Sequence, residues 1–258
     1  MDQYALITGA SKGIGKSIAT ELAGLGYKLM LVARSEAELK SLAGQLQQEY
    51  KITAKYLAID LSAENAVSDV ANWCKSQTSS LNILINNAGY GLWGNFEQLA
   101  IADQLNMLQL NVNAVVALTH HLLPVLKTQK QSYVLNIAST AAYQALPTLA
   151  VYAASKAFTL SYSRALRFEL QDSTVSVSCL CPGPTETGFA SRAGMDALTA
   201  LAEKFNTPPQ AVAAAGLKGM FNKKAEIIPG FVNKISAIGS TLLPKSLIES
   251  ISARLFNN

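Results

Sequence analysis

The chain has few residues that could form disulfides or hold a metal ion. It contains three cysteines and two histidines in 258 residues. So small and odd a number of cysteines excludes a disulfide framework. Cys179 and Cys181 alternate within an apolar run, as small buried side chains do. His120 and His121 adjoin a leucine-rich segment with no acidic cluster beside them, so we expect no metal site.

Charge is also scarce. Only 15% of the residues are charged and half are hydrophobic, a composition that can bury a large core and argues against disorder. The net charge of +4 arises near the C-terminus, where six basic residues and two acidic ones follow Leu217. We expect solvated lysines on a packed helical tail. The alternative left open is weak contact between this tail and an anionic membrane surface or an acidic partner.

No apolar stretch is continuous enough to cross a membrane. Residues 104–126 and 131–155 are uncharged, but each contains a proline and several Asn or Gln residues. Asp2 stands where a secretory signal would carry positive charge, and the first apolar stretch leads straight into a glycine-rich loop. We therefore expect a soluble, cytoplasmic protein.

What the sequence does contain is a regular alternation of short apolar runs with longer helical patterns. The helical patterns cover residues 14–25, 36–50, 101–126, with a bend expected near Pro124, and 150–170. The runs of strand length are residues 4–8, 28–33, 54–59, 82–85, 133–138 and 175–181. Strands this apolar are buried on both faces, as parallel strands are. The alternation predicts a single α/β domain over residues 1–258, a doubly wound parallel sheet of the Rossmann type with right-handed crossovers.

The regular alternation stops after Cys181. A stretch rich in Gly, Pro, Thr and Ser follows, and we expect a substrate lid at 188–209. Ile227 and Ile228 suggest a last short strand, and 227–258 a C-terminal helical tail that Pro229 and Pro244 divide into short helices.

A glycine-rich loop connects the first apolar run to the first helix. Residues 8–15 read Thr-Gly-Ala-Ser-Lys-Gly-Ile-Gly. Gly9 would allow a tight turn, while Gly13 and Gly15 would let the backbone approach a pyrophosphate at the helix N-terminus. The glycine spacing differs from G-x-G-x-x-G. A strand–helix turn that binds nothing is the alternative for this loop alone.

The residues after the second run indicate which dinucleotide would bind. NAD-binding units place an acid there to hold the ribose 2′-hydroxyl, whereas a 2′-phosphate needs a cation. Here the run ends at Arg34, and no acid occurs until Glu36. Arg34 offers a planar fork suited to phosphate, and Lys12 could assist it. The pattern predicts NADP, with a solvated surface arginine as the alternative.

Further motifs follow in order, and together with the glycine loop they resemble the short-chain dehydrogenase/reductase family from Ala5 to about Phe189. The motifs are Asp60-Leu61, Asn86-Asn87-Ala88-Gly89, Asn111, Ser139, Tyr152-Ala153-Ala154-Ser155-Lys156, and Pro182-Gly183 with Thr187. Each is weak alone, but their order and spacing together are specific.

The resemblance implies a cofactor site at the carboxyl ends of the strands. It puts Asp60 and Leu61 beside the adenine, has the Asn86–Gly89 motif close the cleft, and sets Pro182-Gly183 and Thr187 near the nicotinamide. The expected cofactor-binding residues are Gly9, Ser11, Lys12, Gly13, Ile14, Gly15, Arg34, Asp60, Leu61, Asn87, Ala88, Gly89, Tyr152, Lys156, Pro182, Gly183 and Thr187.

The resemblance also implies a catalytic group, Ser139, Tyr152, Lys156 and Asn111. A carbonyl that gains hydride at carbon needs a proton at oxygen, and Tyr152 is the expected donor. Lys156, one helical turn away, would lower the phenol pKa from about 10 and bond the nicotinamide ribose. Ser139 would orient the substrate oxygen, and Asn111 would hold a water. A surface Tyr–Lys pair is the alternative for that motif taken alone.

These residues predict an NADP-dependent oxidoreductase acting on an apolar ketone, aldehyde or acyl substrate. The tail does not match the usual end of the family's tetrameric members, so the resemblance favours a homodimer. A sensor or scaffold of the same fold would be expected to have lost Ser139, Tyr152 or Lys156. An extended epimerase or dehydratase needs a larger substrate domain than follows Pro182, and a membrane-peripheral reductase would differ only in location and substrate. Candidate substrate-lining residues are Tyr90, Leu92, Trp93, Tyr143, Leu146, Phe189 and Met195.

Overall fold

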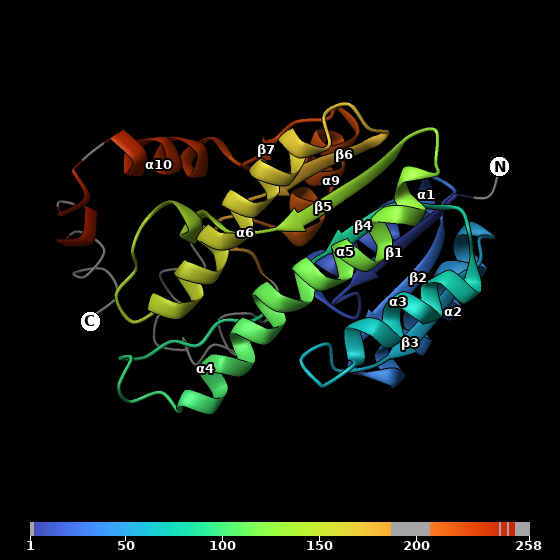
Figure 1. The fold of residues 1–258 in the computed structure, drawn as a ribbon, viewed down its shortest axis with the longest axis horizontal. Coiled ribbons are helices and arrows are strands. Elements are labelled where there is room, and N and C mark those ends of the chain that lie inside the picture. The colour runs from blue at the N-terminus through green and yellow to red at the C-terminus, as the bar shows by residue number, and fades with distance from the viewer. Residues whose placement is uncertain (1–2, 187–206, 243, 247, 251–258) are drawn as a thin grey trace.

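One parallel sheet organises the chain in the computed structural model (Figure 1), which describes residues 3–186, 207–242, 244–246 and 248–250. The strand order across the sheet is β3-β2-β1-β4-β5-β6-β7, and every paired neighbour is parallel. The strands are β1 (Tyr4–Thr8), β2 (Lys28–Ala33), β3 (Ala54–Ala58), β4 (Leu81–Asn86), β5 (Ser132–Ile137), β6 (Val175–Leu180) and β7 (Glu226–Ile227).

The chain reverses its direction of travel across the sheet between β3 and β4. The first three strands are added outward from β1, and β4 then returns to pair with the other side of β1. Open parallel sheets bind ligands beyond the carboxyl ends of their strands at such a switch point. The fold therefore directs attention to the segments that follow β1 and β4.

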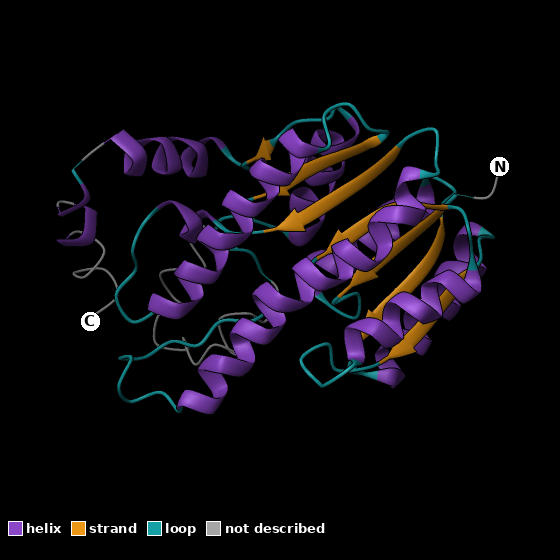
Figure 2. Cartoon of the chain, in the orientation of Figure 1, coloured by secondary structure: helices purple, strands orange, loops and turns teal. Residues whose placement is uncertain are grey.

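Helices cover both faces of the sheet (Figure 2). Side chains of α1, α2 and α9 pack in the core of one face, and those of α3, α5 and the C-terminal end of α6 in the core of the other. The helices are α1 (Gly13–Gly24), α2 (Glu36–Tyr50), α3 (Ala66–Gln77), α4 (Ile101–Leu108), α5 (Ala114–Lys127), α6 (Ala150–Glu169), α9 (Pro209–Phe221) and α10 (Phe231–Leu242). The predicted doubly wound α/β architecture is confirmed.

Alternate residues of the strands enter opposite cores. In β1, Ala5 and Ile7 pack with α1, α2 and α9, whereas Leu6 packs with α3 and α5. All five residues of β1 and all six of β4 are buried. A continuous apolar run is what a strand covered on both faces requires.

The segment predicted as one long helix, 101–126, is interrupted. A π-helical turn, Gln109–Asn113, joins α4 to α5, while Pro124 lies inside α5. Such turns are rare and often occur at functional positions, and this one carries Asn111. Nothing in the apolar periodicity of the segment signalled it.

The C-terminal part of the chain matches its expectations in part. The last short strand is β7, one residue earlier than the Ile227-Ile228 pair. The described residues of the tail 227–258 include α10, which follows Pro229 and Gly230. Most of the predicted lid 188–209 lies outside the described residues, and α9 begins at Pro209. Across the described parts of the chain, no helix has both the length and the apolarity needed to traverse a bilayer.

Candidate active site

The glycine-rich loop after β1 is held by the residue that follows β4. Gly9 has a φ of +64°, in the left-handed region that favours glycine. The Asn87 side-chain amide donates to the carbonyl oxygens of Thr8, at 2.9 Å, and Gly9, at 3.1 Å. A Cβ atom on Gly9 would lie 2.7 Å from Nδ2 of Asn87. A glycine is therefore required here both by conformation and by space.

Thr8 makes a second connection between the same two segments. Its hydroxyl donates to the Ile85 carbonyl oxygen at 3.2 Å and accepts from the backbone amides of Asn87, at 2.9 Å, and Ala88, at 3.0 Å. The loop leads into α1, whose N-cap residue Lys12 makes no side-chain capping bond within the described structure. The first N–H groups of such a helix are suited to bind a phosphate.

Four charged side chains lie in two pairs beside this loop. Lys12 Nζ is 2.8 Å from Oε1 of Glu38, and Arg34 Nη1 is 3.7 Å from Oδ2 of Asp60. The hydrogen bond from Lys12 is the main reason that the pKa of Glu38 lies below its ordinary value. Sequence reasoning missed Glu38, although its place four residues after Arg34, in the first turn of α2, could have suggested it.

Asp60 follows β3, and its carboxylate accepts hydrogen bonds from Ser62. Burial acts to raise its pKa, but hydrogen bonds from the amide of Ser62, at 3.0 Å, and its hydroxyl, at 2.7 Å, bring the pKa below the usual value, with help from Arg34. Leu61 is 5% exposed and packs into the core beneath α3. The expected adenine-side residues thus sit at the carboxyl end of β3, with Leu61 as a core residue.

Asn86 differs from what the resemblance implied. It is 4% exposed, and its side-chain amide donates to Oγ1 of Thr119, at 3.0 Å, and Oδ1 of Asn136, at 2.8 Å. Asn136 donates in turn to Oγ of Ser163 at 2.9 Å. Asn86 therefore belongs to a buried polar chain joining β4, β5, α5 and α6, and Asn87 is the residue that reaches the loop.

Three of the four expected catalytic residues, Ser139, Tyr152 and Lys156, converge near the ends of β5 and β6. Ser139 caps a 3₁₀ turn (Thr140–Tyr143), accepts from the Ala141 amide at 3.1 Å, and has its hydroxyl 3.5 Å from the Pro182 carbonyl oxygen. Tyr152 and Lys156 are buried on α6, and Lys156 Nζ is 5.8 Å from the centre of the Tyr152 ring. The hydroxyl of Ser139 and the phenol of Tyr152 interact.

Burial dominates the protonation of this pair. It raises the pKa of Tyr152 to about 12, against the opposing effect of the Ser139 hydrogen bond. It lowers the pKa of Lys156 to about 8, against the opposing effect of Cys179 and Cys181. The pKa of Tyr152 thus lies above its ordinary value rather than below it, because desolvation disfavours the charged form of the phenol.

Asn111 is fully engaged with its neighbours. Its side-chain amide donates to the Tyr90 carbonyl oxygen, at 2.9 Å, and Oγ of Ser155, at 3.1 Å, while Oδ1 accepts from the Tyr90 amide at 3.1 Å. A Cβ atom on Gly89 would lie 2.9 Å from Oδ1 of Asn111 and 3.4 Å from Nζ of Lys156. Asn111 and Lys156 therefore both pack closely against Gly89, which leaves no room for a side chain at this position.

Most of the candidate substrate-lining residues lie around Tyr152. Tyr90, Leu92, Trp93 and Leu146 pack in the apolar cluster that contains its ring. Tyr143 differs, since its hydroxyl donates to Glu226 on β7 at 2.6 Å. Thr187, Phe189 and Met195 lie outside the described residues.

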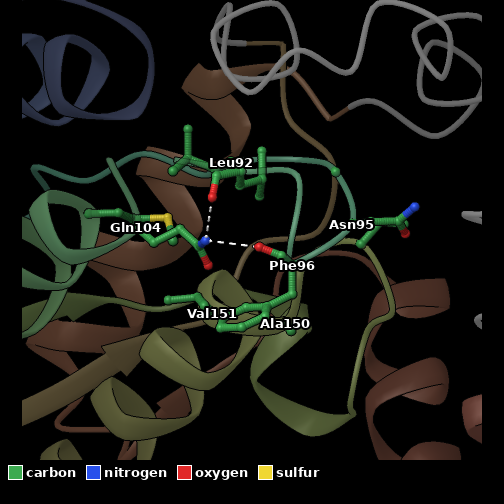
Figure 3. Close-up of a pocket in the computed structure, with 10 residues that line it drawn as sticks. Leu92, Asn95, Phe96, Gln104, Ala150 and Val151 are labelled. Carbon is green, nitrogen blue, oxygen red and sulfur yellow. Dashed lines mark hydrogen bonds between the residues drawn. The ribbon is translucent and has the colours of Figure 1, made fainter. Parts of the chain in front are cut away.

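A pocket opens beside this cluster, between the loop after β4, α4 and the start of α6 (Figure 3). Its floor includes Gln104, whose amide nitrogen donates to the carbonyl oxygens of Phe96, at 3.1 Å, and Leu99, at 3.0 Å. Oε1 of Gln104 is buried and has no partner among the described residues. The lining residues are Leu92, Gly94, Asn95, Phe96, Leu99, Gln104, Met107, Thr148, Ala150 and Val151.

Pro182 and Gly183 follow β6 and meet the C-terminal helix. The Pro182 carbonyl oxygen accepts from the Thr140 amide at 2.8 Å, which joins this segment to the turn after Ser139. A Cβ atom on Gly183 would collide with the side chain of Asn233 on α10. Asn233 of α10 thus packs against the segment expected near the nicotinamide.

The chain matches a known protein family and several known reductases. A family model described as short chain dehydrogenase matches residues 3–197. A very-long-chain 3-oxoacyl-CoA reductase from Phaeosphaeria nodorum is 38% identical over 182 residues, which is 69% of this chain and 53% of the relative. The chain therefore matches about half the length of that fungal protein.

In two further matches, the chain covers a larger share of the related protein. Sulfoacetaldehyde reductase 2 from Chromohalobacter salexigens is 35% identical over 191 residues, 73% of this chain and 75% of the relative. A solved short-chain dehydrogenase from Sphingobium yanoikuyae in complex with NADPH is 28% identical and has a TM-score of 0.83. That match covers 93% of this chain and 92% of the other.

Proposed function

This chain belongs to the short-chain dehydrogenase family, and we propose that it is an NADP-dependent oxidoreductase. It would transfer a hydride between the nicotinamide and the carbonyl or alcohol carbon of an apolar ketone, aldehyde or acyl substrate. The observation that carries the proposal is the convergence of Ser139, Tyr152 and Lys156 at the same sheet edge as the glycine-rich loop.

The residues at this edge fit a dinucleotide with a 2′-phosphate. The uncapped start of α1 and the left-handed Gly9 and Gly13 provide a backbone cradle for the pyrophosphate. Lys12 and Arg34 supply positive charge where a 2′-phosphate would lie. The NADPH complex of the solved relative supports the same cofactor.

When bound, the nicotinamide donates or accepts the hydride, and the chain's own residues manage the oxygen. In the reductive direction, Tyr152 would hold the proton that the substrate oxygen takes, while the Ser139 hydroxyl orients that oxygen. Lys156, whose Nζ lies 5.8 Å from the centre of the Tyr152 ring, would supply positive charge beside the phenol and would also bond the ribose. Because burial raises the pKa of Tyr152 to about 12, the phenol holds this proton at neutral pH.

The surroundings of Tyr152 support an apolar substrate. Its ring lies in a cluster of aromatic and aliphatic side chains, including Trp93, Met107 and Leu149. Apolar linings with a few polar groups are typical of sites for small organic ligands. The 3-oxoacyl-CoA reductase among the relatives is named for an acyl substrate, which agrees with this class.

The test is a nucleotide titration followed by a substrate panel. NADPH and NADH binding is measured by fluorescence, and turnover is then measured with ketones, aldehydes and acyl thioesters. We expect binding selective for NADPH and turnover with at least one class. Tyr152→Phe should lower turnover about 10³-fold and leave NADPH binding nearly unchanged. Lost binding with retained turnover would refute the assignment, and binding without turnover across the panel would favour a sensor.

We also propose a cytoplasmic homodimer. Ile101 and Leu105 on α4, 62% and 57% exposed, lie one helical turn apart, and Phe158 and Phe168 on α6 are exposed as well. Exposed apolar side chains such as these are suited to a contact between copies. Light scattering after size exclusion should give twice the chain mass, and Leu105→Lys should shift it to a monomer. A monomer in the unaltered chain would refute this point.

We also propose that the C-terminal tail, residues 227–258, makes weak contact with a membrane surface. Phe231, Val232 and Ile235 are exposed on α10, next to Lys234. Flotation with anionic vesicles should recover the full chain and lose it when residues 231–258 are removed. Equal recovery of both proteins would refute the contact.

A further inference from the structure

The two cations expected to receive a 2′-phosphate both have acidic neighbours, but the two pairs differ. Arg34 is 3.7 Å from Asp60, whose other oxygen is already held by Ser62. Lys12 and Glu38 are at 2.8 Å, a direct hydrogen-bonded ion pair. The closer of the two pairs is therefore Lys12–Glu38, and its lysine belongs to the glycine-rich loop.

The position of Glu38 explains why this matters. It lies in the first turn of α2, five residues after β2 ends at Ala33, and its pair with Lys12 brings its carboxylate to the glycine-rich loop. Lys12 and, more weakly, the hydroxyls of Ser11 and Ser35 hydrogen-bond its carboxylate and hold its pKa low. A carboxylate and a phosphate accept hydrogen bonds from the same donors. Glu38 therefore already uses donors that a 2′-phosphate would need.

Both partners are free to move apart. The side chains of Lys12 and Glu38 are 60% and 36% exposed, so the pair can open without a change in the core. Opening it for a 2′-phosphate still leaves a negative carboxylate beside a group that carries nearly two negative charges. For a cofactor with a 2′-hydroxyl, the same carboxylate is a hydrogen-bond acceptor rather than a source of repulsion.

We propose that Glu38 sets the cofactor selectivity of this site. Its carboxylate competes with the 2′-phosphate for Lys12 and the neighbouring hydroxyls, and it accepts from a 2′-hydroxyl. The preference for NADPH over NADH is consequently smaller than Lys12 and Arg34 alone would give. The inference deepens the proposed function and rests on it.

The experiment isolates the adenosine end of the cofactor. Calorimetry measures binding of adenosine 2′,5′-bisphosphate and adenosine 5′-monophosphate to the full chain, to Glu38→Gln and to Glu36→Gln. Glu36 is a matched control, since it is an exposed acid in the same helical turn. NADPH and NADH are titrated in parallel.

We expect Glu38→Gln to tighten binding of the 2′,5′-bisphosphate and of NADPH about tenfold, because a like charge is removed. Binding of the monophosphate and of NADH should stay the same or weaken. Glu36→Gln should change every affinity by less than about twofold. Lys12→Gln should weaken the bisphosphate selectively.

Two results would overturn the proposal. An unchanged ratio of bisphosphate to monophosphate affinity in Glu38→Gln would show that the carboxylate does not compete. Weaker bisphosphate binding would show that Glu38 instead holds Lys12 in place for the phosphate. Failure of the unaltered chain to bind any of the four nucleotides would overturn the proposed function as well, which separates the two outcomes.

Discussion

The ammonium group of Lys156 donates a 2.9 Å hydrogen bond to the carbonyl oxygen of Ile137, the last residue of β5. Only 6% of the lysine is exposed, so this bond replaces the water that a charged side chain would otherwise keep. One carbonyl does not compensate fully for lost hydration, which is why the pKa falls to about 8. The lysine is thus held at the strand end at a cost in stability.

That cost predicts a pH dependence of stability. Below about pH 8, Lys156 is charged in both the folded and the unfolded chain, and the cost of burying its charge is complete. Between about pH 8 and 10.5, the unfolded chain binds more protons than the folded one, so the stability of the fold rises with pH. Lys156→Met should be more stable at pH 7, by at most about 3 kcal/mol, and this advantage should shrink towards pH 10. Urea unfolding of both proteins at pH 7, 8, 9 and 10 measures it. A difference independent of pH would contradict the prediction.

Thr8 should be sensitive to the loss of its hydroxyl alone. Thr8→Val keeps the shape but leaves the amides of Asn87 and Ala88 without their acceptor, and we expect a loss of about 2–4 kcal/mol. Nucleotide binding should weaken too, because the loop and the end of β4 separate. Thr8→Ser, which retains the hydroxyl, serves as the control in chemical unfolding. If both variants lose the same stability, packing rather than hydrogen bonding explains the position.

Two glycines should respond in opposite ways to a methyl group. Gly89→Ala places a Cβ 2.9 Å from Oδ1 of Asn111, so we expect a loss of about 1–3 kcal/mol and reduced turnover. Gly44, inside α2, has open space around its Cβ position, so Gly44→Ala should add about 0.5–1 kcal/mol. Thermal unfolding and a turnover assay compare the pair. Normal activity in Gly89→Ala would show that turnover does not depend on the close packing of Asn111 and Lys156 against Gly89.

Two adjacent asparagines should have separable effects. Asn86→Ala removes the buried donor to Oδ1 of Asn136 and to Oγ1 of Thr119 and should cost about 2–4 kcal/mol. Asn87→Ala releases the glycine-rich loop, so nucleotide affinity should fall more than in Asn86→Ala. Unfolding and nucleotide titration of both variants test this. Equal losses of affinity would place Asn86 in the site after all.

Local patterns predicted where the elements lie. The runs that became β1 and β2 were identified with their bounds because each is continuous, apolar and ended by glycine or polar residues. The π-helical turn at 109–113 was missed, since one extra residue in a turn leaves the apolar pattern on either side unchanged. Asn86 was misplaced because the sequence does not show which neighbours a strand's last residue will meet.

The sequence by itself determined the α/β alternation and the doubly wound sheet, which follow from periodicity and from the burial of parallel strands on both faces, both of them local rules. The gathering of Ser139, Tyr152 and Lys156 was implied by the resemblance to a known family. Only the tertiary structure decided that Lys12 is paired with Glu38 and that burial governs Tyr152 and Lys156. Ion pairing and desolvation depend on distances and water exclusion between segments far apart in the chain, and these exist only once the sheet has assembled.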